Sequence, residues 1–196
     1  MAIDKMNKSR LRAFAQLEYK DPEQYLRLWW HTGRLIAALD INYRQKALRT
    51  HGLRIHKERR EVALFCYGLR AATGNSTYEF ADNEASDHDA VFRFIRNGKI
   101  CYTPVQLKEV VPFRLDANAT LKKEITKLEK YPDSQDLVVG FFLNQNGVSE
   151  LTEIEAHNLK IGGIWIFGCC APDRSRWFLF GNILSNPQLF EFAHPK

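Results

Sequence analysis

Two neighbouring stretches of the chain carry acidic, amide and lysine side chains at spacings that bring them together. Residues 87–96 and 99–109 are rich in β-branched and aromatic residues, and only Asn97-Gly98 separates them. Asn-Gly favours a two-residue type I′ turn, because both central residues of this turn need a positive φ. The sequence therefore predicts a β-hairpin whose register is fixed by the turn, with residues at equal distances from it lying opposite each other.

Four polar side chains lie at the open end of this hairpin. The register places Asp89 opposite Gln106. It places Asp87 opposite Lys108 on the same face, and directly opposed residues lie about 5 Å apart at Cβ. Two carboxylates, an amide oxygen and an ammonium group in this space suit a divalent cation beside a positioned water. A solvated surface ion pair is the alternative interpretation, and Pro104 could introduce a bulge that shifts the register.

A helix with two candidate glutamates precedes the hairpin. It is predicted over residues 55–72, and its apolar stripe is formed by Val62, Phe65 and Leu69. Glu58 and Glu61 each lie one turn before a residue of that stripe. We expect Glu61 to reach the end of the sheet, with Glu58 as the reserve. An ordinary surface ion pair with nearby arginines is the other interpretation.

The order of these pieces resembles the PD-(D/E)XK nuclease superfamily over residues 55–145. The matching residues are Glu61 or Glu58 on the helix, Asp89 at the start of one strand, and the triplet Gln106-Leu107-Lys108 on the next. Gln106 replaces the usual Asp or Glu of the triplet, as it does in some nuclease families of this type. His88 stands where the name-giving Pro would be. In such short motifs, order and context carry more weight than letters.

The resemblance implies an Mg²⁺-dependent endonuclease that hydrolyses phosphodiester bonds, with DNA as the expected substrate and Mn²⁺ as a substitute ion. Its catalytic residues would be Asp89, Gln106, Lys108 and Glu61. The metal would be held by Asp89, Gln106, the backbone carbonyl of Leu107, Glu61 and Asp87. Glu61 would orient metal-bound water, and Lys108 would position or polarise the attacking water. The alternative is a catalytically weak or inactive nucleic-acid-binding or protein-interaction module on the same fold.

Periodicity and turn signals predict an α/β fold, a central mixed β-sheet flanked by helices on both faces. Its predicted elements are a helix from Pro22, the helix over 55–72, strands at 77–80 and in the hairpin, a helix after 116–118, a buried strand at 137–143, a helix at 149–158 and a C-terminal hairpin from 164–167 and 177–180. The order helix, three strands, helix, strand is also that of the restriction-endonuclease-like αβββαβ core. Residues 1–54 form an N-terminal helical extension, and residues 55–196 form the nuclease-like α/β domain.

The charge distribution favours a polyanionic partner. With 28 Lys and Arg against 23 Asp and Glu, the 196-residue chain has a formal charge of +5. Basic residues crowd the first third, from Arg10 to Arg60, and one face of the helix bearing Lys122, Lys123, Lys127 and Lys130. They form either a phosphate-binding surface or solvated helix faces. Nucleic acid, with DNA first, is the expected partner, and a homodimer or larger assembly stays open.

Cysteine spacing and hydropathy indicate the cellular environment expected for the protein. None of the four cysteines stands in a Cys-x-x-Cys arrangement, which argues against a zinc site and fits a reduced, cytoplasmic protein. No apolar run reaches the length of a membrane span, and the N-terminus lacks the core of a signal peptide. The sequence therefore predicts a soluble protein without a membrane partner.

Overall fold

The computed structural model describes residues 8–38, 53–83, 88–112, 114–116, 118–131, 134–144 and 159–196. One mixed sheet of seven strands runs through this part of the chain, with the strands side by side in sequence order. The strands are β1 (Glu79–Asp82), β2 (Ala90–Arg96), β3 (Lys99–Val110), β4 (Ser134–Leu143), β5 (Ile161–Cys169), β6 (Arg176–Gly181) and β7 (Gln188–Ala193). The helices are α1 (Lys8–Ala15), α2 (Pro22–Ala37), α4 (Arg54–Thr73) and α5 (Leu121–Thr126), which continues into the 3₁₀ helix η2 (Lys127–Lys130).

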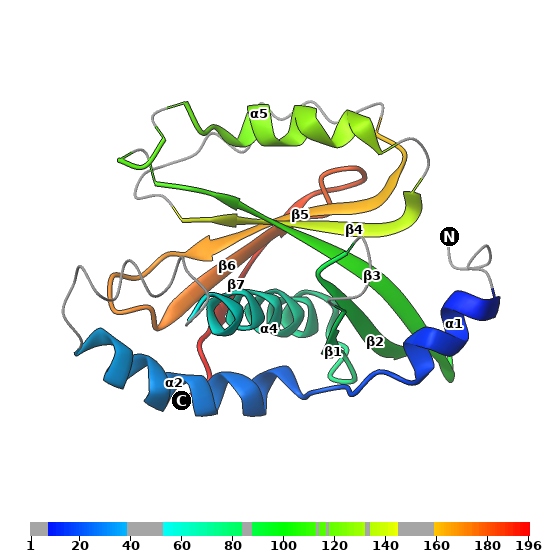
Figure 1. Ribbon diagram of the computed structural model, residues 1–196, viewed down its shortest axis with the longest axis horizontal. Coiled ribbons are helices and arrows are strands. Elements are labelled where there is room, and N and C mark those ends of the chain that lie inside the picture. Colours follow the sequence, from blue (N-terminus) through cyan, green and yellow to red (C-terminus); the bar gives the residue numbers. More distant parts are fainter. Residues whose placement is uncertain are drawn as a thin grey trace.

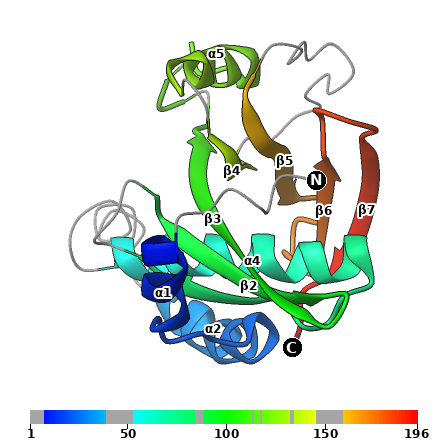
Figure 2. The same cartoon turned by 90° about the vertical axis from the view of Figure 1, so that its right-hand side faces the viewer.

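The sheet separates two layers of helices. α4 lies against one face with α2 packed outside it, and α5 lies against the other face (Figure 1). The sheet curls around α4, and β7 reaches the C-terminal half of this helix (Figure 2), where Phe192 meets Gly68. The prediction of a mixed sheet with helices on both faces is confirmed.

The three central strands, β3, β4 and β5, run parallel, and all other neighbours are antiparallel. A parallel pair needs a crossover connection, which α5 and η2 provide between β3 and β4. From α4 to β4 the elements follow in the predicted order of helix, three strands, helix, strand. β5 and β6 form the predicted C-terminal hairpin. β7 is an additional strand that is not predicted from the sequence. Phe192 is its one buried residue.

The middle of α4 is buried on all sides because apolar residues occupy more than one of its faces. This stretch, from Glu61 to Cys66, is buried without interruption. Phe65 stacks on Phe167 of β5 with ring centroids 5.4 Å apart. Gly140 of β4 leaves room for this packing, since a Cβ there would approach the Phe65 ring to 2.8 Å. The close fit of α4 against the parallel strands positions its polar first turns at the carboxyl ends of those strands.

The β2–β3 hairpin has the predicted turn and register. Asn97 and Gly98 have positive φ values of 52° and 71°, as a type I′ turn requires. Pairing runs without a shift between two end pairs, Arg96↔Lys99 and Ala90↔Val105. Pro104 therefore introduces no bulge, and the register that the sequence predicts holds to the start of β2.

In α2, Leu26 is fully buried in the main core, whereas Leu28 and Leu35 are 71% and 73% exposed. Two local expectations need correction. The strand expected at 77–80 lies at Glu79–Asp82. α5 begins after Thr120, whose hydroxyl accepts the N–H of Lys123, so this residue is the N-cap and residues 116–118 are not. The helix expected at 149–158 falls outside the described residues.

Among the helices in the described ranges, none combines the length and the apolar character needed to cross a membrane.

Candidate active site

β3 presents its polar residues on two faces of the sheet. Leu107 packs in the cluster around α4, and Val110 packs in the cluster beneath α5. Because side chains alternate along a strand, Gln106 and Lys108 project toward the α5 side, and Glu109 projects toward the α4 side. The polar groups at this end of the sheet therefore fall into two sets with separate surroundings.

Asp89 and Gln106 are in contact, as the hairpin register predicts. Asp89 Oδ2 accepts hydrogen bonds from Gln106 Nε2 at 2.5 Å and from the Leu107 N–H at 2.6 Å. The Asp89 N–H donates to the Val105 carbonyl at 3.0 Å, just beyond the last ladder pair. Backbone and side chain of Asp89 are thus both tied to β3. Gln106 directs its amide nitrogen toward the carboxylate, so its amide oxygen points elsewhere.

The charges around Asp89 identify its neighbours. Burial raises the pKa of Asp89, the Leu107 N–H and the charge of Lys108 lower it, and Glu58 raises it. Glu58 lies in the second turn of α4, where Arg54 Nε donates to its carboxylate at 2.7 Å. Among the described residues, Lys108 and Glu58 are therefore the charged side chains that act most on the pKa of Asp89.

Lys108 is half-buried on β3 opposite Phe141 of β4. No hydrogen bond or ion pair joins its ammonium group to another residue in the part of the chain that the structure describes. Its predicted partner across the hairpin, Asp87, lies outside the described residues, so this pairing stays a prediction. An ammonium group beside a fixed carboxylate can donate to a water or to a phosphate oxygen.

Glu61 lies in a different cluster, on the α4 side of β3. It is 5% exposed, and Lys57 Nζ lies 3.4 Å from its Oε1. The same Nζ lies 2.5 Å from Glu109 Oε2, and Asn144 Nδ2 donates to Glu109 Oε1 at 2.6 Å. The expectation that Glu61 reaches the end of the sheet holds, but the structure brings it to Lys57 and Glu109 and not to Asp89.

The pKa shifts in this cluster support its separation from Asp89. Burial raises the pKa of Glu61 to about 7, with Lys57 and Arg60 opposing the rise and Glu109 adding to it. Burial lowers the pKa of Lys57, but the carboxylates of Glu61 and Glu109 outweigh this effect, and the pKa is raised overall. Asp89 is not among the main causes of either shift. Glu61, Lys57, Glu109 and Asn144 form a buried network behind the Asp89 site.

Two polar residues near the hairpin, Glu79 and His88, have structural roles. Glu79 accepts from Arg93 Nε at 2.8 Å, which joins β1 to β2. His88 is buried, and its Nε2 lies 2.5 Å from Asn83 Nδ2, while the edge of its ring meets Phe14. His88 therefore fixes the chain that leads into β2.

The oxygen donors at the hairpin end suit a hydrated magnesium ion. Asp89 and Gln106 each retain a side-chain oxygen outside the hydrogen bonds described above. Mg²⁺ keeps several waters and is commonly held by one or two carboxylates. Across the described ranges, however, no three His, Cys, Asp or Glu side chains gather as a metal-binding group. The residues present therefore fit a weakly held ion with few protein ligands.

Sequence reasoning missed the partners of Glu61. The i, i+4 spacing of Lys57 and Glu61 on one helix face is visible in the sequence and signals their ion pair. Glu109 and Asn144 give no such signal, because their contact depends on the parallel register of β3 and β4. That register comes from tertiary packing.

Several basic residues of the first third have acidic partners. The ion pairs are Arg10–Asp136, Lys20–Asp82, Arg27–Glu23, Arg54–Glu58 and Arg59–Asp82, in addition to those of Lys57. Arg12 and Arg34 are exposed, and Arg44, Lys46 and Arg49 lie outside the described residues. The clustering in the sequence therefore does not translate into one open basic face over the described helices.

Comparisons with protein-family models, with curated proteins and with solved structures returned no match for this chain.

Proposed function

We propose that the chain is a metal-dependent nuclease-like protein that hydrolyses phosphodiester bonds, with DNA as its main substrate. One arrangement carries the proposal: the Asp89 carboxylate is held by the Leu107 N–H and Gln106, with the Lys108 ammonium on the same face of β3. The order from α4 through three antiparallel strands and α5 to the parallel strand β4 supports the restriction-endonuclease-like core implied by the sequence.

Each residue has a defined part in this proposal. Asp89 and Gln106, with the Leu107 carbonyl, would hold Mg²⁺ or Mn²⁺, and Asp87 is proposed as a further ligand. The ion, when bound, would supply positive charge to the scissile phosphate. Lys108 would donate to the attacking water or to a phosphate oxygen, where fixed positive charge stabilises the transition state. The Gln106 amide and the Leu107 N–H keep the Asp89 carboxylate in one orientation.

Glu58, in place of Glu61, would orient a water beside Asp89. The charge of Glu58 acts on Asp89, whereas that of Glu61 acts on Lys57 and Arg60. Glu61 would then support the site indirectly, through the Lys57 ion pairs that hold α4 against the end of β3. This assignment replaces the one based on the apolar stripe of the helix.

A nucleic-acid-binding module that does not cleave is the second candidate. Two observations favour it: Asp89 Oδ2 already accepts two hydrogen bonds, and the described residues contain no group of three metal-binding side chains. A site with few charged ligands holds Mg²⁺ weakly, so nucleic acid could bind without being hydrolysed.

A cleavage assay distinguishes the two candidates. Labelled duplex DNA, single-stranded DNA and RNA are incubated with the purified protein in Mg²⁺, in Mn²⁺ and in chelator. The proposal predicts products with a metal and none with chelator. Binding without products in both metals, on every substrate, would favour the non-cleaving module. Absence of both binding and cleavage would favour a protein-interaction role.

A further inference from the structure

Arg60 of α4 is a half-buried arginine whose guanidinium lies against the core. Its Cζ is 5.2 Å from the centre of the Trp177 ring, and Trp177 is 1% exposed. A ring in this position covers one face of a guanidinium, while the N–H donors lie in the guanidinium plane. Among the residues that the structure describes, none accepts a hydrogen bond from these donors.

Other half-buried arginines contrast with Arg60. Arg59 pairs with Asp82 at 3.0 Å, Arg70 pairs with Asp21 at 2.5 Å, and Arg93 pairs with Glu79 at 2.5 Å. Partly desolvated charges are normally paired, because an unpaired one loses hydration without compensation. The donors of Arg60 are therefore available to an anion from outside the chain.

Arg174 in the β5–β6 turn brings a second cation to the same place. Its carbonyl accepts the Trp177 Nε1–H at 3.0 Å, so the turn is fixed beside the ring that Arg60 covers. Arg174 has a φ of 60°, and its N–H donates to the Ala171 carbonyl at 2.9 Å. Burial lowers the pKa of Arg60 to about 10, and the like charge of Arg174 lowers it as well. An anion between the two guanidinium groups would relieve both effects.

The acidic groups nearby do not fill this role. Glu61 pairs with Lys57 on its own helix, and its pKa of about 7 makes its charge incomplete at neutral pH. Asp173 accepts from the N–H and the hydroxyl of Ser175, and Glu191 pairs with Arg176. Each of these carboxylates has its own partner, and none of them pairs with Arg60 or Arg174.

We propose that Arg60 and Arg174 form a phosphate-binding site over Trp177, and that it holds a backbone phosphate of the bound nucleic acid. This inference rests on the proposed function. Planar guanidinium groups are suited to phosphate because they donate two parallel hydrogen bonds. Three strand spacings, roughly 14 Å, separate β6 from β3 along the sheet. The phosphate is therefore distinct from the one beside Lys108, and the site positions the nucleic acid without touching the reacting atoms.

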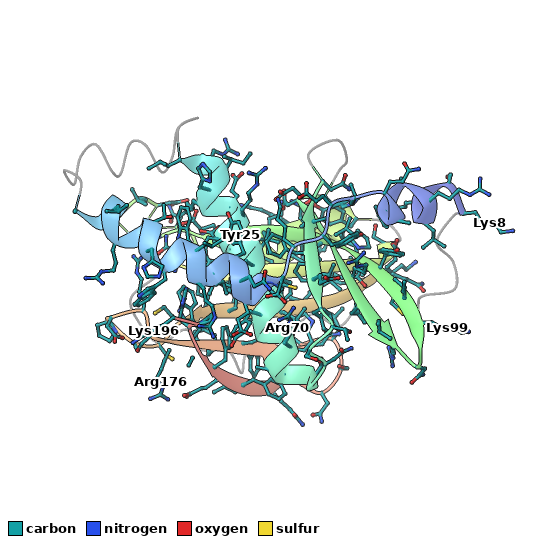
Figure 3. The ribbon with its side chains drawn as sticks, turned by 90° about the horizontal axis from the view of Figure 1, so that it is seen from below. Lys8, Tyr25, Arg70, Lys99, Arg176 and Lys196 are labelled. Carbon is teal, nitrogen blue, oxygen red and sulfur yellow. The ribbon has the colours of Figure 1, made fainter. Side chains whose placement is uncertain are left out.

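The test compares Arg60→Met and Arg174→Asn with a matched control, Arg176→Gln. Met keeps an unbranched chain over Trp177, and Asn tolerates the left-handed backbone of residue 174. Arg176 is an exposed arginine two residues away that pairs with Glu191, and it lies at the same end of the molecule as Lys196 (Figure 3). Circular dichroism and Tm without ligand establish that each variant is folded.

Fluorescence anisotropy with a labelled duplex oligonucleotide, at several salt concentrations, gives the affinity of each protein. We expect each site variant to bind about tenfold more weakly and to lower the log–log salt slope by about one. The Arg176→Gln control should stay within about twofold of wild type. If the wild type binds and both site variants keep its affinity and slope, the inference is overturned while the proposed function stands.

Inorganic pyrophosphate tests the site apart from the proposed function. Should the wild type fail to bind nucleic acid, the proposed function fails, and the effect of pyrophosphate on Tm becomes decisive. A rise in Tm for the wild type and for Arg176→Gln, absent in Arg60→Met and Arg174→Asn, would sustain a phosphate site. No rise in the wild type would overturn it.

Discussion

Glu58 and Glu61 lie one helical turn apart on α4, yet their surroundings assign them different tasks. The side chain of Glu58 is 52% exposed and pairs with Arg54, and its charge acts on Asp89. Glu61 is enclosed with Lys57 and Glu109. Glu58 and Glu61 are three residues apart on α4. Glu58 is therefore exposed to solvent, whereas Glu61 is enclosed with Lys57 and Glu109 on the α4 side of β3.

Replacing Glu58 with Gln should lower the pKa of Asp89, because the negative charge of Glu58 raises it. Glu61→Gln should leave the pKa of Asp89 unchanged. NMR titration of carboxyl carbons in the two variants and in the wild type measures both effects. A larger shift of the Asp89 resonance in Glu61→Gln than in Glu58→Gln would show that the assignment of the two acids is reversed.

Glu61 should also make stability depend on pH. Its pKa is raised by burial from 4.5 to about 7, so between these values the folded protein holds a proton that the unfolded chain releases. The stabilisation that this bound proton contributes to the folded state is fully present below about pH 4.5 and is lost as pH rises through 7. Relative to Glu61→Gln, the wild type should lose on the order of 3 kcal/mol of unfolding free energy over this range.

Urea unfolding of the wild type and of Glu61→Gln at pH 5 and pH 8 measures this difference. Glu18→Gln, at an exposed position, is the control and should follow the wild type. Parallel pH dependence in the wild type and in Glu61→Gln would contradict a buried, proton-binding Glu61.

The β2–β3 hairpin is the element that brings Asp89 to Gln106, and its turn depends on backbone conformation. Gly98→Ala should destabilise the protein by about 1 kcal/mol, because an alanine at a φ of 71° is strained although no atom lies within 4 Å of the added Cβ. Gly33→Ala in the interior of α2 should instead stabilise it by up to about 1 kcal/mol. Thermal unfolding of the two variants checks both signs, and equal signs would contradict this account of the turn.

Elements determined by nearby residues are the ones that the sequence predicts well. Asn97-Gly98 specifies the hairpin, Gly74 at a φ of 65° ends α4, and the apolar run at 137–143 specifies a buried strand. Contacts that depend on tertiary packing escape prediction. α2 has apolar residues at helical spacing on two faces, and only packing decides that Leu26 is buried while Leu28 and Leu35 are exposed. The Glu109–Asn144 contact likewise requires the parallel pairing of β3 with β4.

Over the whole molecule, basic residues outnumber acidic residues by five. Because many basic residues of the described helices have acidic partners, few of them remain to contact phosphates. We expect nucleic-acid binding to weaken with salt, with a log–log slope of roughly −0.9 per phosphate contact on duplex DNA. Anisotropy titrations between low and physiological salt measure the slope. An affinity independent of salt would exclude a binding surface built on these cations.

The central claim is that the Asp89 site hydrolyses nucleic acid, and Lys108→Ala tests it most directly. Cleavage and binding of labelled duplex DNA in Mg²⁺ are measured on the same preparations of wild type, Lys108→Ala and the control Lys99→Ala at the hairpin tip. Under the proposed function, Lys108 acts mainly in the transition state, whereas other cations hold the nucleic-acid backbone. We predict that Lys108→Ala abolishes cleavage with nearly unchanged binding, and that Lys99→Ala retains both. Equal cleavage by the wild type and Lys108→Ala would place the active site elsewhere, and a wild type that binds but does not cleave would refute catalysis.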